Sequence, residues 1–260
     1  MRRRWLFLTT LAAAFVGVGC ATTAPPYNPF KVAQDDFYGK VKTVALAPVS
    51  IPGDLDDPDP VKAKFESLIE GKLREAGLSV IPSKEGEEIW KQMKEHLGGF
   101  FDPITGKRDE AKFKAAREYT LRELHTKFKA DAVLHPRIQV VGAPWSGGTA
   151  TWGGTTESIR STGEMIVEAL PLALLGVGVT RHGSVPALSL VVVIEDIHGI
   201  DMYVNGGGIQ VLSKISGGKF SPVPRPELFA NEERNVAAVN IALGPLVTKS
   251  TPAGPPKEKP

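Results

Sequence analysis

Five histidines are the residues of this chain best suited to general acid–base catalysis or to zinc binding. Zinc peptidases use two histidines in an HExxH pattern, and α/β-hydrolases place a serine nucleophile in a G-x-S-x-G turn. Neither pattern occurs in the sequence. We therefore expect no enzyme, with no catalytic residue, no metal ligand and no cofactor. The histidines are His96, His125, His135, His182 and His198.

An aspartate-rich segment, DLDDPDP at 54–60, is the candidate for binding Ca²⁺, because several carboxylates lie close together. It lacks the glycine at loop position 6 and the glutamate at position 12 that an EF-hand uses. We interpret it as a solvated turn in which Asp59 caps the helix that follows.

Two glycine-rich stretches, at 147–154 and 216–219, resemble loops that cradle phosphate. No Lys-Ser or Lys-Thr pair follows the first stretch, and the second lacks the earlier glycine of a P-loop. We expect turns or flexible loops in both places.

The only cysteine, Cys20, follows a leader of three arginines at 2–4 and about 14 mostly apolar residues at 5–18. That run fits the core of a signal peptide and is shorter than the ~20 residues of a membrane-spanning helix. With Gly17 and Gly19 before Cys20, the segment resembles the lipobox of bacterial lipoproteins, which prefer leucine where Gly17 stands. The resemblance implies that residues 1–19 are removed and that Cys20 is the lipid attachment site, carrying diacylglycerol and an acyl chain such as palmitate. The alternative is an uncleaved N-terminal anchor.

The residue after the cysteine bears on location. Ala21 stands where lipoproteins retained in the inner membrane often carry aspartate. The same resemblance therefore implies an outer-membrane lipoprotein that faces the periplasm.

Composition limits the partners. The formal net charge is +2, and three arginines leave with the leader, so the mature chain of about 240 residues is close to neutral. We expect no nucleic-acid partner, since such proteins carry a basic surface. With its single cysteine acylated, the domain has no disulfide and depends on packing.

Proline content divides the chain. Residues 20–35 read as an extended, lipidated tether, of which 21–35 reach at most ~50 Å. Residues 249–260 read as a disordered, proline-rich tail. Between them we expect one periplasmic domain over 36–248.

The domain opens with a strand–helix–strand pattern. Residues 41–49, VKTVALAPV, are nearly continuously apolar and predict a buried strand. A helix follows from Asp59, with Pro60 at its first position and Gly77 as its end. A short strand at 78–81 completes a βαβ unit.

The later elements complete an α/β (α+β) fold: a single mixed β-sheet with packed helices, a βαβ start and a C-terminal β-hairpin plus helix. Pro136 favours a sheet edge or a bulge for its strand, and Gly244 with Pro245 is expected to stop the last helix. The expected elements are a helix at 83–97 capped by Ser83, a helix at 110–129, a strand at 130–141, a hairpin of 188–194 with 201–204, a turn at 205–208, a strand at 209–212 and a helix from Asn231.

Residues 142–186 show no clear hydrophobic periodicity of a helix or a strand. They are rich in glycine, hydroxyl groups, tryptophan and aliphatic side chains. Two interpretations stay open, ordinary core and a contact surface for another subunit, a partner protein or the membrane.

The order of elements carries a family likeness. The lipobox, VKTVALAPV, REAGLSVIP, ADAVLHPRI, the hairpin LVVVIEDIHGIDMYV and a closing helix before ALGPLV resemble envelope lipoproteins of the CsgG and LpoB kind, which share a TolB-N-terminal-like α/β domain. The resemblance implies a non-enzymatic periplasmic domain that works by binding or assembling.

We accordingly predict a non-enzymatic accessory or assembly factor of the cell envelope, acting through contacts with other envelope proteins. One alternative is a homo-oligomeric export pore of the CsgG type. Another is a hydrolase or ligand-binding domain whose site residues are dispersed along the sequence.

Overall fold

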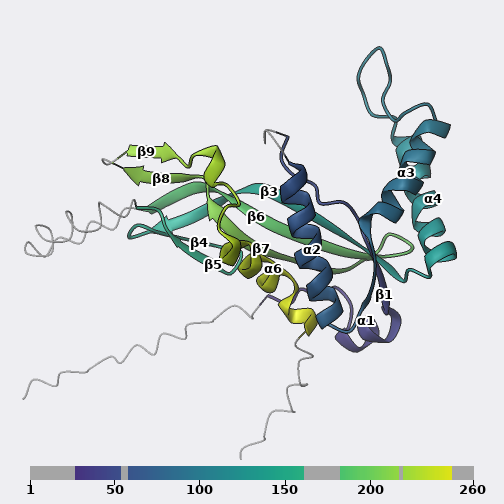
Figure 1. Cartoon of the computed structure of the whole chain (residues 1–260), viewed down its shortest axis with the longest axis horizontal. Coiled ribbons are helices and arrows are strands. Elements are labelled where there is room, and N and C mark those ends of the chain that lie inside the picture. The colour runs from purple at the N-terminus through teal and green to yellow at the C-terminus, as the bar shows by residue number, and fades with distance from the viewer. Residues whose placement is uncertain (1–26, 54–57, 161–181, 217–218, 248–260) are drawn as a thin grey trace, which may run out of the picture.

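A mixed β-sheet with helices on both faces organises the molecule (Figure 1). The computed structural model describes residues 27–53, 58–160, 182–216 and 219–247. Within these residues the sheet has seven strands, and a separate two-stranded sheet lies beside it. The predicted α/β class with a single main mixed sheet is confirmed. The strands are β1 (Thr43–Leu46), β2 (Ser79–Ile81), β3 (Ala132–Ser146), β4 (Thr149–Trp152), β5 (Thr155–Ser158), β6 (His182–Asp196), β7 (Asp201–Val211), β8 (Ser213–Ser216) and β9 (Lys219–Pro222).

The helices divide between the two faces of the sheet. Adjacent residues of β1 and β3 point to opposite sides, so Val44 and Leu134 belong to the core under α2 and α6, whereas Ala45 and Val133 pack under α3 and α4. The second group is much the smaller. The helices are α1 (Gln34–Lys40), α2 (Asp59–Glu75), α3 (Ser83–His96), α4 (Glu110–Phe128) and α6 (Glu232–Val247), with a 3₁₀ turn at Arg225–Glu227.

The βαβ start is present as predicted. β1 pairs in parallel with both β2 and β3. The helix α2 between β1 and β2 buries Phe65, Ile69 and Leu73, and the chain turns at Gly77, whose φ is +81°. Glycine, which has no Cβ, adopts that left-handed conformation with little steric cost.

Two predicted helix caps are wrong. Pro58 precedes α2, and Asp59 is its first residue, where the carboxylate pairs with Lys62 at 3.0 Å. Ser83 is likewise the first residue of α3, and its hydroxyl donates to Glu66 at 2.7 Å. Residues 54–57 of the aspartate-rich segment lie outside the described residues.

The strand β3 runs on through Pro136, and because β1 pairs with β3 only as far as Leu134, this part of β3 lies at a sheet edge, as predicted. Pro136 pairs with Val192 of β6, and its carbonyl accepts from the N–H of Ser50 at 3.0 Å, so its ring nitrogen faces the loop after β1. No ladder bond to β6 is lost there, because the missing N–H is on the other side of the strand.

The predicted turn at 205–208 is also wrong, since β7 continues through Gly206, Gly207 and Gly208. A Cβ on Gly207 would overlap the carbonyl of Ala238 in α6. A Cβ on Gly208 would lie 2.7 Å from the main-chain oxygen of Trp152 on the opposite face. These glycines permit close approach of neighbouring backbones rather than a change of direction.

The described parts of 142–186 form strands. The end of β3 turns at 147–148 into β4, and β4 turns at 153–154 into β5. The strand β5 then lies beside β7, where the N–H of Gly208 donates to the carbonyl of Gly153 at 3.0 Å. The indole of Trp152 is buried and donates to the carbonyl of Leu188. The first glycine-rich stretch therefore forms turns, as expected.

The last helix extends past its predicted stop, to Val247, with Pro245 inside it. A proline removes the hydrogen bond to the carbonyl four residues earlier, here Ile241. That carbonyl instead accepts from the side-chain amide of Asn205 at 3.0 Å. The start of the helix agrees with the prediction, since the side chain of Asn231 accepts from the N–H of Arg234.

The folded unit begins before its predicted start at 36. Phe30 is buried and forms a β-bridge with Tyr203 of β7, and its ring lies 5.5 Å from that of Phe37 in α1. The predicted tether is thus packed onto the domain from Phe30 onward. The leader, Cys20 and the tail at 249–260 lie outside the described residues.

Candidate functional site

A cleft of about 850 Å³ opens on the less covered face of the sheet, between that face and the helices α3 and α4. It lies beyond the carboxyl end of β1, against β3. From β1 the chain passes through α2 to β2, which lies on one side of β1. From β3, on the other side of β1, it continues to β4 and β6, farther in that direction. Open α/β sheets bind ligands at such switch points. Residues that line the cleft include Ser50, Lys62, Glu87, Trp90, Phe113, Arg117, His135, Arg137, Glu195 and Asp201.

A buried carboxylate, Glu195, forms the floor of the cleft with its two partners. Its side chain is 5% exposed, and its oxygens accept from His135 Nε2 at 2.7 Å and from the guanidinium of Arg117. Burial by itself raises the pKa of Glu195, but the hydrogen bonds and charges of His135 and Arg117 outweigh it and leave this pKa below its ordinary value. Glu195 is therefore ionised at neutral pH.

The carboxylate fixes the imidazole of His135. Because Nε2 donates to Glu195, Nδ1 is the nitrogen that can accept or bind a proton. The side chain is 40% exposed, and no group in the described ranges hydrogen bonds with Nδ1. The pair can therefore orient a ligand or take a proton from one.

The other charges of the cleft differ in whether they are paired. Lys62 is paired with Asp59. Arg137 is exposed on β3, opposite Ser50, and forms no ion pair with any residue that the structure describes. Glu87 and Asp201 are exposed acids at the rim.

Aromatic side chains form the apolar wall. Trp90 of α3 and Phe113 of α4 have ring centroids 5.3 Å apart, and both pack on the buried Phe100. Each of the two is only partly buried. The cleft thus offers an apolar surface beside fixed charges, the combination typical of small-ligand and peptide sites.

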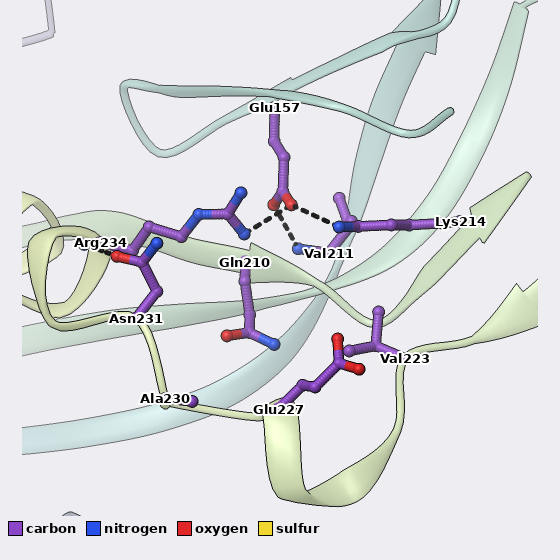
Figure 2. A pocket seen from close by; sticks show the side chains of 9 residues that line it. All are labelled: Glu157, Gln210, Val211, Lys214, Val223, Glu227, Ala230, Asn231 and Arg234. Atoms are coloured by element: carbon purple, nitrogen blue, oxygen red, sulfur yellow. Dashed lines mark hydrogen bonds and ion pairs between the residues drawn. The ribbon is translucent and has the colours of Figure 1, made fainter. Parts of the chain in front are cut away.

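A second, smaller cavity of about 380 Å³ lies at the other end of the sheet (Figure 2). The carboxylate of Glu157 in β5 accepts from Arg234 of α6 at 2.6 Å and from the N–H of Val211 at 2.8 Å, with Lys214 at 3.8 Å. Its side chain is 6% exposed. With its carboxylate committed to these partners, Glu157 ties β5 to β7 and α6, and we interpret this cluster as structural.

The histidines do not come together. Among the described residues only His135 reaches a carboxylate, while His125 bonds through Nδ1 to the carbonyl of Ala130 at 2.8 Å. Within the described part of the chain, no group of three or more His, Cys, Asp or Glu side chains is arranged to hold a metal ion.

Sequence reasoning missed Glu195, Arg117 and Arg137. The available signal was an acid at the end of the apolar run LVVVIED, where burial of a carboxylate demands a partner. The partner itself depends on the pairing of β3 with β6, which a local pattern does not contain.

A comparison with models of known protein families finds no match for this chain, and no curated protein sequence is significantly similar to it. The likeness to envelope lipoproteins therefore stays a prediction from the order of elements.

Among the residues that the structure describes, none forms a helix both long and apolar enough to cross a membrane.

Proposed function

We propose that this chain is an outer-membrane lipoprotein, held by acyl chains on Cys20, whose periplasmic domain acts without catalysis as an accessory factor of the cell envelope. It does so by contacting other envelope proteins. The sequence supports the anchor, since the only cysteine follows a leader of signal-peptide length. The observation that carries the binding role is the cleft, where a partly exposed aromatic wall lies beside Arg137, which has no ion-pair partner among the described residues.

The anchor is tested by Cys20→Ala. We expect the variant to lose incorporation of labelled palmitate and to leave the outer-membrane fraction. Full labelling together with unchanged outer-membrane retention would refute the lipid anchor.

The binding role is tested by crosslinking in intact cells. A photoreactive phenylalanine at the cleft residue Glu87 is compared with one at Asn240, an exposed residue of α6. We expect a defined crosslinked envelope protein from position 87 and a weaker one or none from position 240. Equal products at both positions, or no product at 87, would contradict binding at the cleft.

The pairing of His135 with Glu195 favours a second candidate, a hydrolase or ligand-binding domain with dispersed site residues. A carboxylate that orients an imidazole is one part of a general base. Hydrolysis of ester or peptide substrates by the purified protein, lost in His135→Gln, would favour this candidate over the first.

A further inference from the structure

Among the described residues that line the cleft, Arg137 is the cation without an ion-pair partner. The guanidinium of Arg117 is taken by Glu195, and the ammonium group of Lys62 pairs with Asp59. Arg137 has no such carboxylate in the described ranges, although it lies two residues from His135 on the same face of β3. Arginine recognises carboxylates through two parallel hydrogen bonds, so this position is suited to an acidic group from outside.

The main chain under Arg137 is held firmly. The loop after β1 bonds to β3 on either side of this residue, through Ser50 N–H to the carbonyl of Pro136 at 3.0 Å and Ile138 N–H to the carbonyl of Ser50 at 2.7 Å. Because these backbone groups are already paired, a ligand is not added as an extra strand here. Recognition depends on side chains.

The apolar wall faces the same space. Trp90 and Phe113 line the cleft with Arg137, and their edge-to-face packing fixes both rings. A volume of about 850 Å³ lies toward the upper end of the usual range for ligand pockets, so more than one side chain fits.

Two acids restrict the charge of the ligand. Glu87 and Asp201 line the same cleft and have no ion-pair partner among the described residues. These acids repel every negative charge of a polyanion, and only one of those charges can pair with Arg137, so a single carboxylate is the better match.

From these features we infer that the cleft binds a segment of a partner protein that carries one acidic side chain flanked by apolar ones. The acid pairs with Arg137, and an apolar neighbour packs against Trp90 and Phe113. This inference rests on the proposed function and names the chemistry of the partner.

The test is an NMR titration of the isotope-labelled protein, truncated before residue 21, with the capped peptide acetyl-Ala-Leu-Asp-Leu-Ala-amide. We expect shifts centred on Arg137 and on the Trp90 indole, and at least tenfold weaker binding of the Asp→Asn peptide. Arg137→Ala should bind both peptides equally weakly, and Arg137→Lys should keep part of the preference.

The matched control is Arg122→Ala, an exposed arginine of α4 that does not line the cleft. It should bind like the wild type. Because Arg137 is exposed, its variants should keep the wild-type melting temperature. Equal binding of the Asp and Asn peptides by the wild type, or an unchanged preference in Arg137→Ala, would overturn the inference. Tighter binding of polyglutamate or inorganic phosphate than of the Asp peptide would overturn it in favour of a polyanion or a small anion.

The two proposals fail separately. Loss of the peptide preference with intact palmitate labelling and crosslinking at position 87 leaves the accessory role standing and removes only this ligand class. Failure of labelling and crosslinking removes the accessory role, whatever the peptide does.

Discussion

The side-chain amide of Asn205 in β7 takes the place of a hydrogen-bond donor that Pro245 lacks in α6. It lies 3.0 Å from the carbonyl oxygen of Ile241, the acceptor that an ordinary residue at 245 would bond. The same amide reaches the carbonyl of Ala242, also at 3.0 Å. A strand residue thus completes the last turn of a helix.

This relationship predicts that the effect of Asn205→Ala on the free energy of unfolding depends on the residue at position 245. In the wild type the substitution should lower the free energy of unfolding by ~1–3 kcal/mol, because the carbonyl of Ile241 loses its donor, whereas that of Ala242 keeps the hydroxyl of Tyr203. In a Pro245→Ala background the loss should be smaller, since the new N–H bonds to Ile241. Urea unfolding of the four proteins measures the coupling. The same loss in both backgrounds would contradict this role of Asn205.

Gly207→Ala should destabilise the fold by at least ~3 kcal/mol, because the new methyl group overlaps the main chain of Ala238 and neither backbone can yield easily. Gly71→Ala is the matched control. Nothing lies within 4 Å of a Cβ there, inside α2, and helix propensity predicts a gain of up to ~1 kcal/mol. Chemical unfolding compares the two, and a cost below ~1 kcal/mol at Gly207 would show that the helix can shift.

Stability should depend on pH through Glu195. Its folded-state pKa is below the ordinary 4.5, so its contribution is present above that value and is lost as the pH falls through the folded-state pKa. Glu195→Gln should therefore be less stable than the wild type at pH 7, with a difference that shrinks below about pH 4.5. Unfolding free energies from pH 7 to pH 3 measure this. A difference independent of pH would mean that the charge of Glu195 contributes nothing.

Arg234→Met should lower the free energy of unfolding by ~1–3 kcal/mol, because it removes one partner of the buried Glu157 while Val211 N–H and Lys214 remain. Adding Glu157→Gln should recover part of the loss, since the uncompensated charge is then gone. Thermal and urea unfolding of the single and double variants checks both statements. No recovery in the double variant would show that packing of the Arg234 stem carries the effect.

The parts of the fold that were predictable are those specified by local pattern. The continuous apolar run of β1, the periodic stripe of α2 and the left-handed stop at Gly77 each depend on neighbours in the sequence, and each element was found. Glycines and prolines misled where tertiary contacts gave them another role. The missing side chain of Gly207 lets α6 approach β7 closely. Pro245 is tolerated because Asn205 donates a hydrogen bond to the carbonyl of Ile241.

The cleft could not be predicted in the same way. His135 and Glu195 are 60 residues apart and meet only because β3 pairs with β6 in one register. Arg117, which also contacts Glu195, belongs to the helix α4 over the sheet. The sequence shows the residue types, but the contacts depend on the arrangement of three separate elements.

The bridge between Phe30 and Tyr203 shortens the tether between the domain and its proposed anchor. The ~10 residue steps from Cys20 to Phe30 extend at most ~35 Å, against the ~50 Å expected for the longer tether. With Cys20 lipidated as proposed, the domain moves within a shallow layer beneath the membrane. For a partner held in the same layer, the tether length sets the volume in which the two proteins meet and so raises their local concentration. A partner whose binding segment lies farther from the membrane than this tether plus the length of the domain cannot contact the domain.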